Sequence, residues 1–140
     1  MIRKFEMKDT KRVMQIWLEA NLEAHDFVSG DYWCSQYQTV QEQLSAADIY
    51  VYEQDNEIQG FLGMMDNYLA GIFVDKKYRS MGIGKGLLDY VKKIYPAFSL
   101  NVYQKNQRAV DFYLRENLTI VSTGVDEDTA EADYTVVWKK

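Results

Sequence analysis

The spacing of apolar residues along the chain predicts four helices. The first begins at Asp9, an expected N-cap, and a second with weaker periodicity covers residues 32–46. The third follows a glycine-rich stretch and ends before Pro96, the only proline, and the fourth begins after Asn106, another expected N-cap. The expected inward-facing positions are Val13, Ile16, Trp17 and Ala20, then Ile83, Leu87, Val91 and Ile94, then Ala109, Phe112 and Tyr113.

Runs of β-branched and aromatic residues predict strands between these helices. The run from Leu69 to Val74 is apolar without alternation, which predicts a strand buried on both faces. Strands and helices intermix without a linker or repeat, so the pattern predicts one α/β domain with a mixed sheet over residues 1–140. The expected strands are residues 2–5, three segments within 48–75, 98–102, and a closing hairpin of 118–124 with 133–139.

Composition narrows the class of protein. Of the 140 residues, 47% are apolar and 26% are charged, which is ordinary for a globular domain. No stretch approaches the ~18 apolar residues that span a bilayer, and no signal peptide is evident, so we expect no membrane attachment. Cys34 is the only cysteine and cannot form an internal disulfide, which favours a cytoplasmic location. We expect Cys34 to be a small buried hydrophobe.

Charge is distributed unevenly. The net charge of −5 argues against nucleic acid as a partner. Residues 75–93 nevertheless carry six basic and two acidic side chains, a local charge of +4 that leaves −9 for the rest of the chain. A basic island in an acidic protein predicts the binding of a small anion. The twelve acidic and five basic residues of 1–66 either favour a cationic second substrate or form a solubilising surface.

The sequence YRSMGIGKGLL (78–88) places three glycines at alternate positions where the third helix begins. A glycine destabilises a helix by about 1 kcal/mol relative to alanine, so another gain must offset this loss. A strand, a glycine turn and a helix N-terminus together present free N–H groups to a phosphate. Neither common nucleotide motif fits. Leu87 replaces the third glycine of the dinucleotide fingerprint, while Arg79 and Gly86 replace the first glycine and the final Ser/Thr of the P-loop.

A third motif does fit. Residues 79–84 match the R/Q-x-x-G-x-G/A signature of the GNAT superfamily of N-acetyltransferases, which binds the pyrophosphate of acetyl-CoA. IFVD (72–75) and NQRAVDFY (106–113) resemble the family's preceding strand and its second signature, N-x-x-A-x-x-F-Y; Lys76 stands where proline is usual. EAHDF (23–27) and NVYQKNQRAVDFY (101–113) are similar to the small bacterial YjaB-type branch. The resemblance implies the GNAT fold, a mixed, mostly antiparallel twisted sheet of about seven strands flanked by about four helices.

The resemblance also implies roles for individual residues. Tyr113 would be the general acid that protonates the departing CoA thiolate, although it also fits the core of an amphipathic helix. The general base is open. Asn101 stands where some family members carry a glutamate, so the alternatives are His25, a nearby acidic group, or a water relayed through Asn101. His25 equally fits a helix C-cap.

Binding of acetyl-CoA would rest mainly on the backbone. Gly71 indicates a bulge or close approach in the strand that would pair with the pantetheine arm. No cluster of His, Cys and acidic residues has ligand spacing, so we expect no metal. The residues implied in acetyl-CoA binding are Ile72, Phe73 and Val74 along the pantetheine, Arg79, Ser80, Met81, Gly82, Ile83, Gly84 and Lys85 at the pyrophosphate, and Asn106.

Together these features predict an acetyl-CoA-dependent N-acetyltransferase in which a primary amine attacks the thioester directly. The alternative is a catalytically inactive acyl-CoA-binding or regulatory module, because the strand glutamate is missing. A nucleotide-binding switch is disfavoured because both nucleotide motifs fail. The acceptor is a small-molecule or peptide amine, and antibiotic, polyamine, amino acid, peptide N-terminus and protein lysine all fit. The sequence is compatible with a monomer or a homodimer.

Overall fold

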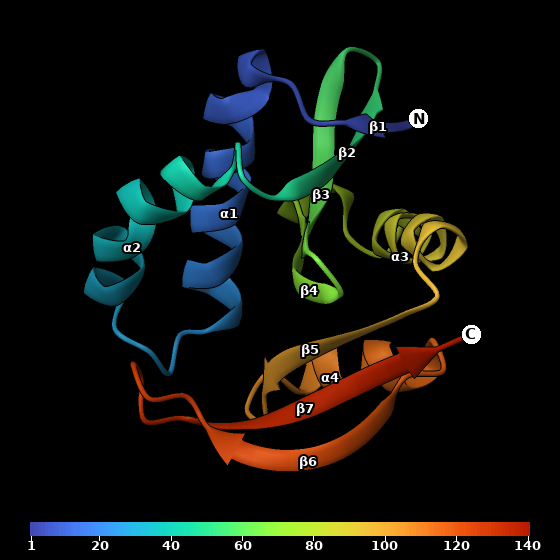
Figure 1. Cartoon of the computed structure of the whole chain (residues 1–140). Coiled ribbons are helices and arrows are strands. Elements are labelled where there is room, and N and C mark those ends of the chain that lie inside the picture. Colours follow the sequence, from blue (N-terminus) through green and yellow to red (C-terminus); the bar gives the residue numbers. More distant parts are fainter.

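The computed structural model describes residues 1–140 and contains a single seven-stranded sheet with four α-helices (Figure 1). The strand order is β1-β2-β3-β4-β5-β7-β6, and every neighbouring pair is antiparallel except β4–β5. The predicted mixed, mostly antiparallel sheet with four helices is therefore confirmed. The strands are β1 (Ile2–Lys4), β2 (Asp48–Gln54), β3 (Glu57–Met65), β4 (Tyr68–Val74), β5 (Ala97–Tyr103), β6 (Thr119–Val125) and β7 (Ala132–Lys139).

The helices cover both faces of the sheet. They are α1 (Thr10–Ala24), α2 (Gly30–Gln43), α3 (Ile83–Ile94) and α4 (Gln107–Arg115), with short 3-10 helices η1 (Met7–Asp9) and η2 (Lys76–Tyr78). Figure 1 shows α1 and α2 on one side of the sheet and α3 on the other. Alternate residues of the central strands supply two cores: Val51 and Phe61 pack towards α1, whereas Leu62 packs towards α3 and α4. None of the helices is long and apolar enough to cross a membrane.

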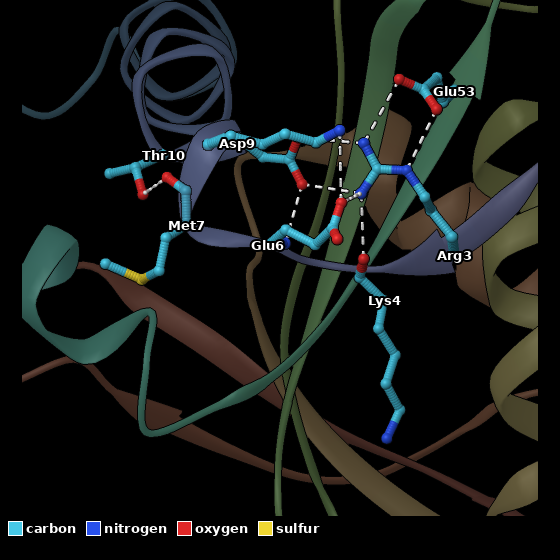
Figure 2. Close-up of polar contacts among 8 residues, drawn as sticks. Arg3, Lys4, Glu6, Met7, Asp9, Thr10 and Glu53 are labelled. Atoms are coloured by element: carbon cyan, nitrogen blue, oxygen red, sulfur yellow. Dashed lines mark hydrogen bonds and ion pairs between the residues drawn. The ribbon is translucent and has the colours of Figure 1, made fainter.

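Arg3 ties the first strand to the segment that leads into α1 (Figure 2). Its guanidinium donates to Asp9 Oδ2 at 2.8 Å and to Asp9 Oδ1 at 3.0 Å, and its Nε donates to Glu53 Oε1 at 3.1 Å. This hydrogen bonding holds the pKa of the buried Asp9 carboxyl below its usual range. Asp9 is the N-cap of α1, but its side chain accepts from Glu6 N (2.8 Å) and from Arg3 instead of capping that helix.

Three details of the predicted elements are wrong. The second helix begins two residues earlier than expected, because the Ser29 hydroxyl accepts from Asp31 N and caps it there, and it ends at Gln43 instead of residue 46. Ile94 was expected to face inward but is 50% exposed at the end of α3. Cys34 was expected to be buried, yet it lies exposed on α2, whose only fully buried residue is Trp33.

Candidate active site

The sheet opens between β4 and β5, its only parallel pair. A single pair of Cα partners, Tyr68 and Ser99, joins the two strands, and they diverge beyond it. The remaining edge of β4 therefore keeps backbone N–H and C=O groups that no strand pairs, and an edge of this kind can accept an extended chain as an added strand. The prediction that residues 69–74 are buried on both faces is wrong, since only Leu69 is fully buried.

Ile72, Phe73 and Val74, the residues expected along the pantetheine arm, form the half-buried part of this open edge. The bulge expected at Gly71 is present: the register shifts opposite Gly63, and Ala70 is the extra residue. A Cβ on Gly71 would lie 2.5 Å from the Phe73 ring, so a larger residue would displace Phe73. The opening of the sheet and the bulge thus leave unpaired the edge of β4 that was predicted to lie along the pantetheine arm.

The start of α3 fits an anion. Gly82 is its N-cap and has φ +84°, a conformation that favours glycine because it lacks a Cβ. The first N–H groups of a helix have no intrahelical partner and carry a partial positive charge. A Cβ on Gly84 would meet no atom closer than 3.7 Å, so the protein leaves space there. The backbone of residues 82–85 therefore presents free donors at the place where the sequence predicts a pyrophosphate.

The basic side chains of this segment already have partners. Arg79 pairs with Glu23 at the end of α1, and Lys85 Nζ lies 3.0 Å from Glu116 Oε1 and 3.3 Å from Asp89 Oδ2. Ser80 Oγ accepts from Arg108 of α4 at 3.4 Å, and Met81 is 68% exposed. In this conformation the main chain, and not Arg79 or Lys85, presents the free donors.

A cavity of about 280 Å³ lies at the opening of the sheet, and it brings together many of the predicted residues. Six of them line it: His25, Ile72, Phe73, Asn101, Asn106 and Tyr113. The predicted pyrophosphate segment, residues 79–85, lies outside the cavity. The other cavity-lining residues are Trp17, Asn21, Trp33, Tyr68, Ala70, Gly71, Val102, Tyr103, Ala109, Asp126 and Asp133.

Tyr113 reaches this cavity from α4. It is only 7% exposed and packs against Phe112 and the core of the sheet. Its hydroxyl makes no hydrogen bond to another protein group, and burial raises its pKa above the ordinary value near 10. Tyr113 is therefore protonated at neutral pH and has a proton that it can donate in the cavity.

His25 lies at the C-cap of α1, and both of its ring nitrogens are hydrogen-bonded. Asn106 Nδ2 lies 3.0 Å from Nε2, and Asn21 Oδ1 lies 2.9 Å from Nδ1. The Asn106 amide oxygen accepts from Ala109 N at 3.3 Å, so its NH₂ group must face His25. His25 Nε2 is then an acceptor and Nδ1 carries the proton. Burial lowers the pKa of His25 to about 4, so the ring is neutral at pH 7.

Asn101 also has both ends of its amide occupied. Its Oδ1 accepts from the Tyr68 hydroxyl at 2.8 Å, and its Nδ2 donates to Thr135 Oγ1 at 3.1 Å. An amide cannot accept a proton from an ammonium group at neutral pH, whereas a carboxylate can. The carboxylates among the lining residues are Asp126 and Asp133.

Sequence reasoning missed Asp126 and Asp133 as residues of the site. Asp126 follows β6, and its Oδ2 accepts from the Tyr103 hydroxyl at 2.8 Å. Asp133 lies on β7 opposite Tyr103, and burial together with the charge of Asp126 raises its pKa. The only signal for Asp133 in the sequence was a charged residue near the start of a predicted strand. Its position in the site depends on the pairing of β7 with β5.

Comparison with known proteins identifies the family. Residues 10–117 match the acetyltransferase (GNAT) family. The chain is 33% identical over 140 residues to the peptidyl-lysine N-acetyltransferase YiaC of Escherichia coli strain K12, covering 99% of this chain and 96% of that protein. It is 27% identical to the peptidyl-lysine N-acetyltransferase YjaB of Salmonella typhimurium, covering 91% and 88%.

The fold gives the same result. The solution structure of apo YjaB from Escherichia coli superposes with a TM-score of 0.86 at 22% identity, covering 98% of this chain and 95% of that one. The fold, the two signatures and the family match agree over most of the chain. This protein therefore belongs to the GNAT family and is an acetyl-CoA-dependent N-acetyltransferase.

Proposed function

We propose that this enzyme acetylates the side-chain amine of lysine residues in peptides or proteins. One observation carries the proposal: Asp126 and Asp133 line a cavity whose walls include Trp33, Tyr68 and Tyr103. Carboxylates attract an ammonium group, and aromatic rings pack favourably against an alkyl chain that carries a cation. A lysine side chain has both features. The relatives YiaC and YjaB, named as peptidyl-lysine N-acetyltransferases, support the same substrate class.

Each part of the reaction has a candidate group in the chain. The edge of β4 and the start of α3 would hold acetyl-CoA, which supplies the activated acetyl group when bound. Tyr113 would give its proton to the departing thiolate. We propose direct attack by the amine, because Cys34 is not among the cavity-lining residues and no other thiol exists in the chain. A free, exposed thiol also suits a cytoplasmic location.

The experiment uses the purified chain, acetyl-CoA, and a peptide with a blocked N-terminus and one lysine. Mass spectrometry should find a single acetyl group on that lysine, and a thiol assay should detect equimolar CoA. The same peptide with arginine in place of lysine should remain unmodified. Acetylation of a free peptide N-terminus or a small polyamine, with the lysine peptide untouched, would refute the proposed substrate class.

The role of Tyr113 is tested with Tyr113→Phe, and Tyr52→Phe is the matched control. Tyr52 lies on β2 outside the cavity, and its hydroxyl donates a hydrogen bond to Gln54 Oε1 at 3.3 Å. Loss of a general acid lowers kcat by about 10²- to 10⁴-fold, whereas Tyr52→Phe should leave kcat unchanged. Affinity for acetyl-CoA should be retained in both variants. Unchanged turnover of Tyr113→Phe at saturating substrates would exclude it as the acid.

A further inference from the structure

The register between β5 and β7 determines which of their side chains line the cavity. Asn101 lies opposite Thr135, and Tyr103 lies opposite Asp133. Opposed residues of an antiparallel pair project from the same face, and residues two apart on a strand share that face. The four side chains therefore lie together on the face that carries α1 and α2, where the Tyr103 ring packs 4.9 Å from His25.

Tyr113 approaches from the opposite face. It belongs to the same core as Leu100 and Val102, which alternate with Asn101 and Tyr103 along β5. The cavity at the opening of the sheet is thus lined by Tyr113 from the α4 side and by Asp133 from the α1–α2 side. A proton donor for a leaving group and a proton acceptor for an attacking group are needed on two sides of one reacting carbon.

Most titratable groups in the cavity are already protonated or already accept hydrogen bonds from the protein. Burial raises the pKa values of the tyrosines Tyr68, Tyr103 and Tyr113, which keeps these side chains protonated at neutral pH. His25 has both ring nitrogens in hydrogen bonds. Asp126 is also engaged: its Oδ2 accepts from Tyr103, and its Oδ1 accepts from the backbone N–H of residue 128 at 2.9 Å.

Asp133 is the exception. Its carboxylate accepts no hydrogen bond from the protein, although the residue is half-buried and lines the cavity. We propose that Asp133 is the general base, and that its carboxylate takes a proton from the acceptor ammonium before the amine attacks. This inference rests on the proposed function, because it takes the lysine ammonium as the group that enters. Burial and the nearby charge of Asp126 also make Asp133 a stronger proton acceptor.

The steps balance in atoms and protons. An N–H bond of the ammonium breaks, and its proton moves to Asp133. The nitrogen lone pair then forms a C–N bond to the acetyl carbonyl carbon, while the C–S bond breaks and the sulfur takes the Tyr113 proton. The new amide nitrogen loses its second proton to the Tyr113 phenolate, and Asp133 releases its proton to water. One proton is released for each acetyl group transferred.

Gly124 of β6 provides a way to move this carboxylate without removing it. Gly124 lies opposite Asp133, and a Cβ there would be 3.2 Å from Asp133 Oδ1. The φ of Gly124 is not in the positive range that favours glycine, so alanine is compatible with the backbone. Gly124→Ala should therefore displace the carboxylate while its charge is kept. Glu127 is exposed in the loop between β6 and β7 and lies outside the cavity, so Glu127→Gln is the matched control.

The test compares Asp133→Asn, Gly124→Ala and Glu127→Gln with the wild type on the lysine peptide between about pH 6 and pH 10. Asp133→Asn should lower kcat by about 10²- to 10⁴-fold near pH 7, and this loss should shrink as pH approaches the ~10.4 pKa of a free lysine. Gly124→Ala should lower kcat by about tenfold, and Glu127→Gln should have no effect. Calorimetric affinity for acetyl-CoA and the melting temperature should be unchanged in all three.

Two results would overturn the assignment. A higher KM for the peptide in Asp133→Asn with kcat retained would make Asp133 an ammonium-binding residue and not a base. An equal loss of kcat in Asp133→Asn and Glu127→Gln would show that the change in overall charge, and not the position of Asp133, causes the loss. If the wild type acetylates another amine instead of lysine, the proposed substrate class fails, and the same variants are then measured on that amine. If Asp133→Asn does not fold, the Gly124→Ala kinetics decide the question.

Discussion

His25 should make the stability of this protein depend on pH between pH 7 and pH 5. Its pKa is about 4 in the folded protein, and an unfolded histidine has a pKa of about 6.5. Between these values the unfolded chain binds more protons than the folded chain, so stability falls as the pH falls. The cause is structural: the ring lies among Phe27, Trp33 and Tyr103, and its Nε2 accepts a hydrogen bond that protonation would abolish.

The magnitude follows from linkage. The difference in pKa amounts to roughly 3 kcal/mol once the pH is below both values, and about 2 kcal/mol of it is lost between pH 7 and pH 5. The pKa values of Asp9 and Asp75 are lowered in the folded protein. Their stabilising contributions are therefore lost only at lower pH, as the pH falls through these folded-state pKa values. The raised pKa of Asp133 acts with the opposite sign, so the difference between the wild type and a variant without the histidine isolates the effect of His25.

His25 is the only histidine, which makes the measurement direct. Its ring gives one set of NMR signals, whose titration should have a midpoint near pH 4 and whose nitrogen shifts should report a proton on Nδ1. The control His25→Gln keeps one donor and one acceptor but does not titrate, and it should lose about 2 kcal/mol less than the wild type between pH 7 and pH 5. A midpoint near 6.5, or equal losses in both proteins, would refute the reasoning.

Two further predictions concern stability. Gly86 lies inside α3, and a Cβ added there would meet nothing within 4 Å, so Gly86→Ala should raise the free energy of unfolding by about 0.5–1 kcal/mol. Gly82 has φ +84°, so Gly82→Ala should lower the free energy of unfolding by about 1 kcal/mol. Urea unfolding of each variant measures both changes. Arg3 and Asp9 form two charged hydrogen bonds, so a double-mutant cycle of Arg3→Met and Asp9→Asn should give a coupling energy of about 1.5–3 kcal/mol, and additive losses would contradict it.

The elements of this fold were largely readable from the sequence because their signals are local. Helical spacing and the Asn106 cap depend only on residues a few positions apart, and the structure has Asn106 Oδ1 accepting from Ala109 N as expected. The main error, a fully buried strand at 69–74, concerned a non-local feature. An apolar run does not reveal that its neighbour in the sheet turns away after one pair of residues.

The candidate site likewise contains residues that local sequence patterns identify and residues whose positions depend on non-local contacts. The predicted pyrophosphate segment and Tyr113 lie in short sequence motifs, so their placement in the fold follows from these motifs alone. Asp133 enters the site only through its register with Tyr103, and this register is set by the packing of β7 between β5 and β6. His25 was readable as a histidine at a helix end. The sequence did not predict that His25 Nε2 accepts a hydrogen bond from Asn106, which is 81 residues away.

The contact between His25 and Asn106 bears on how the opening in the sheet is maintained. Only one pair of residues joins β4 to β5, so strand pairing cannot fix the separation of the two halves. Asn106 caps α4, and His25 ends α1, so their hydrogen bond connects a helix of each half across the cavity. Arg79, in the segment that follows β4, pairs with Glu23 near the same end of α1, so this contact lies within one half. The hydrogen bond at the C-terminal end of α1 thus joins the two halves of the sheet where strand pairing is lost, and the cavity lies at this opening.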